Sequence, residues 1–318
     1  MLQIIKIWAD HCNNLGKIPN NDLIKVVPLE TFDRSRLDEA LVRERGTPER
    51  VPVESKEIRQ LIGLYSGQNN QVSDSSAAGG ANMKHAIFYM PHKAYMALLK
   101  ECVVEFGNTN IAGNDLISGL TWRSLMRAWV STKSNDVLEP VSELLRPFDA
   151  RPNFAQSFKA MYLGTLNFEN RITMPLSTLV SQDTSIASVA NTIRAATDSQ
   201  ATQENLLDAY VLLRDTPDYN QVQWQATHTS GASVGILSPI VLPFNDTCFG
   251  KDIFGNEGKP DAFRPIMGTG NRGFRTCFVI PRKKHGGLEF VMTLSEEEMN
   301  FLENDIEFSR YAFPIGLP

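Results

Sequence analysis

The sequence predicts an α/β protein in which a mixed β-sheet is flanked by helices. Three observations support this fold class. Helical hydrophobic patterns dominate as far as residue 215, whereas from residue 222 the apolar residues follow the two-residue period of strands. Helical and strand patterns do not alternate strictly, which favours a mixed sheet. The 318 residues, 42% hydrophobic and 21% charged, are enough to bury a substantial core.

The first predicted element is an amphipathic helix, "MLQIIKIWADHCNNLG", with Gly16 as its C-terminal cap. Its apolar face is made of Met1, Ile4, Ile5, Trp8, Cys12 and Leu15. Because no N-cap and no strand precede this face, we expect the chain to begin inside a core-facing element. A second helix is predicted near residues 53–65. The stretch 66–82 holds almost no large apolar side chain, so it predicts a linker and the main domain boundary.

A strand and two helices are predicted directly beyond the linker. Residues 85–90 predict the strand, and Pro91 suits the first turn of the helix that follows it. Residues 114–130, "NDLISGLTWRSLMRAWV", predict a strong helix that Asn114 or Asp115 caps.

The rest of the chain predicts further helices and most of the sheet. The expected elements are strand and loop over 161–180, two helices over 184–215, and strands at 222–228, 234–244, 274–282 and 287–294. The closing helix, residues 294–308, has Ser295 as its N-cap and Glu298 at the capping-box position.

Composition excludes several classes of protein. The net charge of −5 without a basic stripe argues against nucleic acid and anionic membranes as partners. No apolar stretch is long enough to cross a bilayer, and Lys6 and Asp10 interrupt any signal peptide. The four cysteines form no CxxC pair, which predicts free thiols in a reducing, cytoplasmic setting and no zinc site: Cys12, Cys102, Cys248 and Cys277.

Two strings imitate catalytic motifs. Residues 231–235, "GASVG", match a nucleophile elbow with Ser233 as nucleophile and His285 as the only later histidine, but the run that follows is of β type instead of helical. Residues 268–273, "GTGNRG", match a dinucleotide fingerprint, yet a strand follows where that motif requires a helix. The first string is better explained as a strand that contains glycines, and the second as a hairpin turn.

The histidines share no metal-ligand spacing, and each alone is more often a packed or surface residue than a catalyst. They are His11, His85, His92, His228 and His285. His228, on a predicted strand, would be the first to test.

Four strings occur in an order that resembles one known family. They are "NDLISGLTWRSLMRAW", "FDARPNF…MYLGT", "FGKDIFGNEGKPDAFRP" and "IPRKKHGGLEFVMTLSEEEM". They resemble the C-terminal part of the BAHD-type acyltransferases, and more narrowly the fungal secondary-metabolism O-acetyltransferases typified by trichothecene 3-O-acetyltransferase. Two departures occur. Thr165 stands where the family tends to have asparagine, and the Asp-Phe-Gly string is either Cys248-Phe249-Gly250 or Asp252 with Phe254-Gly255.

The resemblance implies a chloramphenicol-acetyltransferase-like fold. Residues 1–65 would be a remnant of the N-terminal domain, 66–84 the crossover loop, and 85–318 the C-terminal domain. It implies no bound cofactor, acetyl-CoA (or another acyl-CoA) as co-substrate, and a small-molecule alcohol as acceptor. Candidate acyl-CoA or channel residues are Tyr162, Gly164, Ser238 and Lys259. Structural motif residues would be Asp149, Arg151, Phe254, Gly255, Gly258, Pro260 and Arg264.

The family's catalytic signature, His-x-x-x-Asp, should stand just before the opening helix. None of the five histidines in the chain has aspartate at the fourth following position, so the resemblance assigns no catalytic residue here. We therefore expect an acyl-CoA-dependent O-acyltransferase in truncated form. The alternatives are a non-catalytic remnant of the family and a serine hydrolase using Ser233. Although the family is usually monomeric, the apolar face of the opening helix predicts self-association of this chain.

Overall fold

The structure is a computed structural model. It describes residues 2–15, 29–46, 56–63, 83–107, 110–133, 141–155, 162–216, 218, 231–241, 247–261, 263–265, 275–281 and 286–316. Several sequence predictions lie outside these residues: the Gly16 cap, the linker 66–82, the strand 222–228, the string 268–273, and the side chains of His228 and His285.

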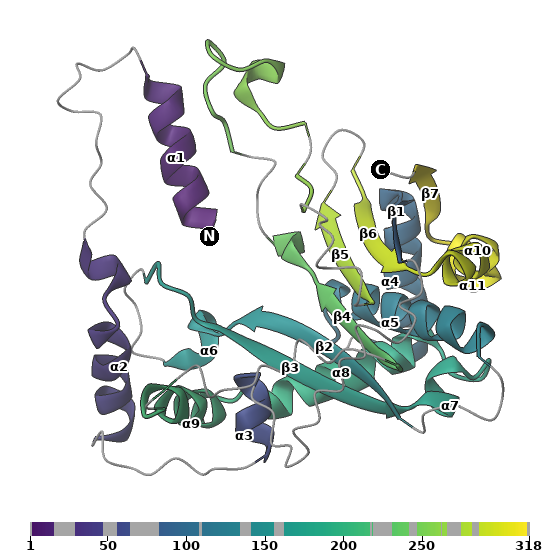
Figure 1. Cartoon of the computed structure of the whole chain (residues 1–318), viewed down its shortest axis with the longest axis horizontal. Helices are drawn as coiled ribbons and strands as arrows, with labels where there is room; N and C mark the ends of the chain where they lie inside the picture. Colours follow the sequence, from purple (N-terminus) through teal and green to yellow (C-terminus); the bar gives the residue numbers. More distant parts are fainter. Residues whose placement is uncertain are drawn as a thin grey trace.

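The described residues form one seven-stranded sheet in the order β3-β2-β4-β5-β6-β1-β7 (Figure 1). The strands are β1 (Lys84–Met90), β2 (Val141–Asp149), β3 (Asn167–Pro175), β4 (Ser233–Leu237), β5 (Thr276–Pro281), β6 (Leu288–Leu294) and β7 (Phe313–Gly316). Strand β4 is parallel to β2 and to β5, and the other pairs are antiparallel. The predicted mixed sheet is confirmed. The carboxyl ends of β2, β4 and β5 therefore meet at one edge.

One face of the sheet packs against helices to form the main core. These helices are α4 (His92–Phe106), α5 (Gly113–Ser131), α7 (Leu176–Val180), α8 (Ile186–Gln200), α10 (Glu296–Asn304) and α11 (Ile306–Ser309). The central helix, α5, is buried along most of its length. At Gly119 an added Cβ would lie 3.2 Å from the Ile186 carbonyl oxygen and the Ala190 nitrogen, so the glycine lets α5 and α8 pack closely.

A second core lies at the β3 end of the sheet. It joins α2 (Ser35–Arg45), α3 (Lys56–Leu61), α6 (Arg151–Phe154) and α9 (Gln203–Arg214). Phe154 and Tyr210 meet edge to face in it, with ring centroids 5.5 Å apart. A buried ion pair, 2.6 Å between Arg45 Nη1 and Asp208 Oδ1, joins α2 to α9. Helices α2 and α3 thus share a core with the part of the chain beyond the predicted linker.

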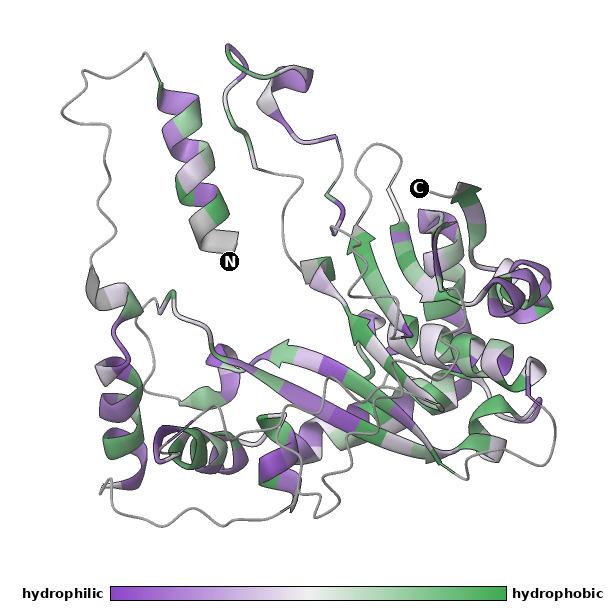
Figure 2. Cartoon of the chain, viewed as in Figure 1, coloured by the Kyte–Doolittle hydropathy of each residue, from purple (hydrophilic) through white to green (hydrophobic). Residues whose placement is uncertain are grey.

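Helix α1 (Leu2–Asn14) packs against the loop 247–261, and Figure 1 places the two side by side above the sheet. The Trp8 ring meets Phe249 edge to face, with centroids 5.2 Å apart. Figure 2 shows that α1 carries both apolar and polar residues. Ala9 is buried, whereas Trp8 stays 60% exposed. The predicted exposure of the apolar face holds for Trp8, but the loop covers other parts of the helix.

Several predicted boundaries were wrong. The N-cap of α5 is Ala112, and Asp115 is the third residue of the helix. The Asp115 carboxylate accepts the Ala112 N–H at 3.0 Å. The strand predicted over 234–244 ends at Leu237, where Pro239 begins a 3-10 helix (Pro239–Val241). The closing helix divides at Asp305 into α10 and α11.

Two predicted segments are only partly as expected, and some elements were missed. The segment 161–180 ends in helix α7, and the helix predicted over 53–65 is described only as α3. The strand β2, the helices α2 and α6, the 3-10 helix Leu29–Phe32 and the strand β7 were not foreseen.

Candidate functional site

Several predicted site residues lie where strands of the sheet end or begin on one edge. Asp149 ends β2, Ser238 follows β4, and Tyr162 and Gly164 precede β3, which starts opposite the end of β2. In open α/β sheets, ligands bind outside the carboxyl ends of the parallel strands. The topology thus gathers four predicted residues at the edge where such proteins bind ligands.

Asp149 and Arg151 form a local clamp. The Arg151 Nε lies 2.8 Å and 3.0 Å from the two Asp149 carboxylate oxygens, and the Arg151 backbone N–H donates to the same carboxylate at 3.0 Å. The Arg151 Nη1 also donates to the Tyr162 carbonyl at 3.1 Å. The pair fixes the turn from β2 into α6 and ties it to the segment that leads into β3. These contacts therefore position the backbone at this turn.

Tyr162 and Gly164 are packed against each other. Tyr162 is buried in the second core, and its hydroxyl would lie 2.2 Å from a Cβ placed on Gly164. Any side chain at Gly164 would therefore displace the tyrosine ring. The Leu163 N–H donates to the Thr31 carbonyl at 2.7 Å, which anchors this turn to the segment before α2.

Ser238 has an unsatisfied hydroxyl. Its Oγ is buried and has no hydrogen-bond partner in the described part of the chain, although it could both donate and accept. Buried hydroxyls usually find partners, so Ser238 keeps an unused donor and acceptor at the edge of the sheet.

The other predicted residues except Arg264 lie in the loop 247–261, which is held by hydrogen bonds within itself. The Phe249 N–H donates to the Gly258 carbonyl at 2.7 Å, and the Asn256 Nδ2 donates to the Lys259 carbonyl and to Asp261. Asn256 and Glu257 both have positive φ, 53° and 56°. Only a few per cent of non-glycine residues do, so these hydrogen bonds hold a strained backbone.

The glycines of this loop are not equivalent. Gly258 has φ +78°, and an added Cβ would lie 2.6 Å from the Gly250 backbone. Gly250 has φ +103°, and its added Cβ would lie 3.1 Å from the Cys12 carbonyl oxygen of α1. Gly255 has open space around it. Of the two alternatives for the Asp-Phe-Gly string, the geometry favours Cys248-Phe249-Gly250, because only that glycine is required.

Phe254 and Lys259 are exposed, Pro260 is half-buried, and Phe254 contacts Phe249 at 6.1 Å between ring centroids. Arg264 lies beyond the loop and reaches the sheet, where its Nε is 3.1 Å from a carboxylate oxygen of the buried Glu289 in β6. Apart from Arg264, the predicted residues thus form two groups, one at the edge of the sheet and one in the loop.

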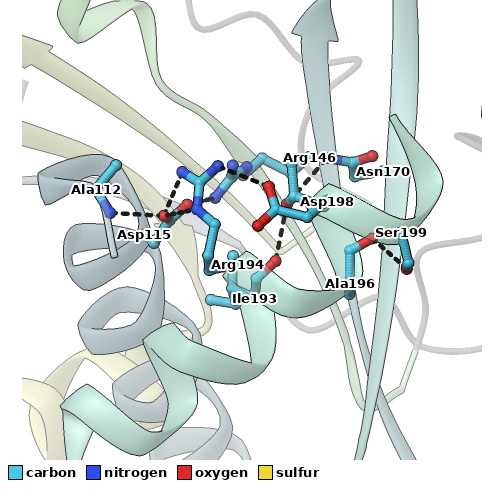
Figure 3. A network of polar contacts seen from close by, with 10 residues as sticks. Ala112, Asp115, Arg146, Asn170, Ile193, Arg194, Ala196, Asp198 and Ser199 are labelled. Carbon is cyan, nitrogen blue, oxygen red and sulfur yellow. Dashed lines mark hydrogen bonds and ion pairs between the residues drawn. The ribbon is translucent and has the colours of Figure 1, made fainter. Parts of the chain in front are cut away.

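Sequence reasoning missed a buried ion network (Figure 3). Asp115 is fully buried, accepts from Arg146 of β2 at 2.8 Å, and accepts from the Arg194 Nε of α8 at 2.8 Å. The network joins α5, β2 and α8. The one signal of this network in the sequence was an aspartate, Asp115, near the start of a predicted helix.

The nucleophile-elbow motif gains no support. Ser233 is the first residue of β4 and is followed by strand, so it does not sit on a strand-to-helix turn. Among the residues that the structure describes, no three His, Cys, Asp or Glu side chains gather to hold a metal ion. None of the helices described in the structure has the length and apolarity needed to span a bilayer.

Known proteins resemble this chain in sequence and in fold. The model of the Transferase family matches residues 30–309. The isocyanide synthase-NRPS hybrid crmA of Aspergillus fumigatus is 33% identical over 204 residues, which are 63% of this chain and 13% of that protein. The eremophilane O-acetyltransferase prx11 of Penicillium rubens is 28% identical over 206 residues, which are 64% of this chain and 41% of that protein.

A solved structure has the same fold. TRI101 of F. graminearum, complexed with coenzyme A and T-2 mycotoxin, matches with a TM-score of 0.62 and 22% identity, over 82% of this chain and 54% of that one. These matches confirm the expected family and fold. The chain spans about half or less of the length of each of these proteins.

Proposed function

Since the chain belongs to the Transferase family, we propose that it is an acyl-CoA-dependent O-acyltransferase. Its acceptor would be a hydroxyl of a fungal secondary metabolite such as a terpenoid, meroterpenoid or alkaloid. The transferred group would be acetyl. The observation that carries this proposal is the family match over residues 30–309. The likeness to an eremophilane O-acetyltransferase supports the acceptor class. Four cysteines with free thiols support a cytoplasmic location.

The reaction sets three demands on the site. The alcohol oxygen forms a bond to the acyl carbon, its proton passes to a base, and the coenzyme A thiolate leaves. A positioned base contributes about 10²–10⁴ in rate, and donors must stabilise the oxyanion of the tetrahedral intermediate. We propose that Tyr162, Gly164 and Ser238 line the channel and that Lys259 meets a phosphate of coenzyme A. The unpartnered Ser238 hydroxyl and the exposure of Lys259 support these roles.

A second candidate is a binding role without catalysis. It is favoured by one observation, which is that no histidine in the chain is followed at the fourth position by aspartate. Both candidates require acyl-CoA binding and differ in turnover.

Calorimetric titration of the chain with coenzyme A tests the shared requirement. We expect Lys259→Gln to weaken binding about tenfold at low salt, because it removes one charge-assisted contact worth about 1.4 kcal/mol. Lys251→Gln is the matched control, since Lys251 is also exposed on the same loop. Absence of binding by the unchanged chain, or equal weakening by both variants, would contradict the proposal.

A further inference from the structure

Arg171 is a buried arginine on the face of the sheet that the main-core helices do not cover. It lies in β3, directly opposite Leu145 of β2, while its neighbour Ile172 points into the main core. Its side chain is only 2% exposed. Figure 2 shows hydrophilic stretches on β2 and β3.

The backbone of Arg171 is held firmly, although β3 is the outermost strand of the sheet. The Gln200 side chain of α8 donates to the Arg171 carbonyl at 2.8 Å and accepts the Arg171 N–H at 3.2 Å. The Gln200 amide thus satisfies the Arg171 N–H and carbonyl, which would otherwise be unpaired because β3 is an outer strand. The position from which the guanidinium extends is therefore fixed by the fold.

Only part of the guanidinium is satisfied. The Nη1 donates to the Glu143 carboxylate at 2.8 Å. The Nε and Nη2 atoms are both buried and have no hydrogen-bond partner among the residues that the structure describes. Burial of unpaired donors on a charged group is costly, so a native protein seldom leaves them empty.

The two unpaired donors are adjacent on one edge of the guanidinium and point the same way. This edge matches the two oxygens of a carboxylate in a bidentate pair. We infer that Arg171, with Glu143 and Glu169 beside it, forms a binding subsite for a ligand carboxylate on the face of β2 and β3 opposite the main core.

The neighbouring acids favour a monoanion over a phosphate. Glu143 already balances the charge of Arg171, and Glu169 lies close enough to interact with both. Burial raises the pKa of the Glu169 carboxyl, so it accommodates one added negative charge by holding its proton more readily. A dianionic phosphate would meet stronger repulsion in the same place.

The carboxylate could belong to a small molecule or to a polypeptide terminus, and both present the same two oxygens. The inference does not depend on acyl transfer, because binding is measured without coenzyme A and without an acyl donor. A failure of the proposed function would leave it standing.

The test is titration of the ¹⁵N-labelled chain with sodium benzoate, with benzamide, and with a short peptide that has a free C-terminal carboxylate. We expect benzoate, the peptide or both to shift the Arg171 Nε–H resonance, and benzamide to leave it in place. The arm that binds identifies the source of the carboxylate. Calorimetry should then show binding at least tenfold weaker in Arg171→Lys, which keeps the charge and loses the paired donors.

Arg310→Lys is the matched control, because Arg310 is an exposed arginine paired with Glu101. If Arg171→Lys fails to fold, Glu143→Gln replaces it and should tighten carboxylate binding severalfold by removing a negative neighbour. An Nε–H resonance that neither carboxylate moves would mean that water alone occupies the donors and would overturn the inference. Equal shifts by benzamide, or unchanged affinity in both Arg171→Lys and Glu143→Gln, would also overturn it.

Discussion

At the scale of single residues, Asp115 shows what local sequence can and cannot reveal. Its place near the start of a helical pattern made it a candidate cap, and its carboxylate does accept the Ala112 N–H. Its two arginine partners lie 31 and 79 residues further along the chain. No local pattern pairs residues at such separations. By contrast, Asp149 and Arg151 are two residues apart, and the resemblance named both as structural motif residues.

Asp115 also yields a stability prediction. Asp115→Asn should lower the free energy of unfolding by about 3–5 kcal/mol, because it leaves Arg146 and Arg194 without their shared buried anion. Urea unfolding followed by circular dichroism measures the change. Lys84→Gln removes an exposed ion pair with Glu296 and should cost about 0–1 kcal/mol. Equal losses in the two variants would show that the network is not the anchor described.

At the scale of elements, strong periodic patterns were predicted well and interrupted ones were not. The closing helix has the predicted capping box, with the Glu298 N–H donating to Ser295 Oγ at 3.2 Å. Strand β2 was missed because Pro147 and charged residues break its alternation. The fold tolerates Pro147 because β4 pairs only with residues 143–145 of β2.

The contact between α1 and the loop 247–261 can be tested through one glycine. Gly250→Ala should loosen α1, because the residue has φ +103° and the added Cβ would meet the α1 backbone at 3.1 Å. We expect faster proteolytic cleavage within residues 2–14 and a lower Tm. Gly255→Ala is the matched control, since nothing lies within 4 Å of its added Cβ. If Gly250→Ala and Gly255→Ala behave alike, α1 does not depend on this approach.

At the scale of the whole molecule, the fold class followed from the mixture of periods, but the strand order did not. Placing β4 between β2 and β5 depends on contacts between distant segments, which a local hydrophobic pattern does not encode. The candidate site has the same limit. The resemblance supplied Tyr162, Gly164 and Ser238, whereas their common edge became visible only with the topology.

The exposed aromatic patch of Trp8, Phe249 and Phe254 predicts self-association. Trp8 and Phe254 both contact Phe249, and both remain largely exposed. We expect the purified chain to associate in sedimentation velocity, and Trp8→Gln to reduce association. Val104→Gln on α4 is the control, because Val104 is exposed outside this patch. A monodisperse sample with a cooperative thermal transition would count against this expectation.

The turnover of the purified 318-residue chain with acetyl-CoA and a panel of terpenoid alcohols tests the central claim most directly. That claim is that these residues supply an acyl-CoA-binding wall but no His-x-x-x-Asp base. We predict measurable coenzyme A binding with acetyl transfer about 10²–10⁴ slower than the roughly 1–10³ s⁻¹ typical of enzymes. Acetylation at an ordinary enzymatic rate by this chain alone would contradict it and require a different proton acceptor within the sequence.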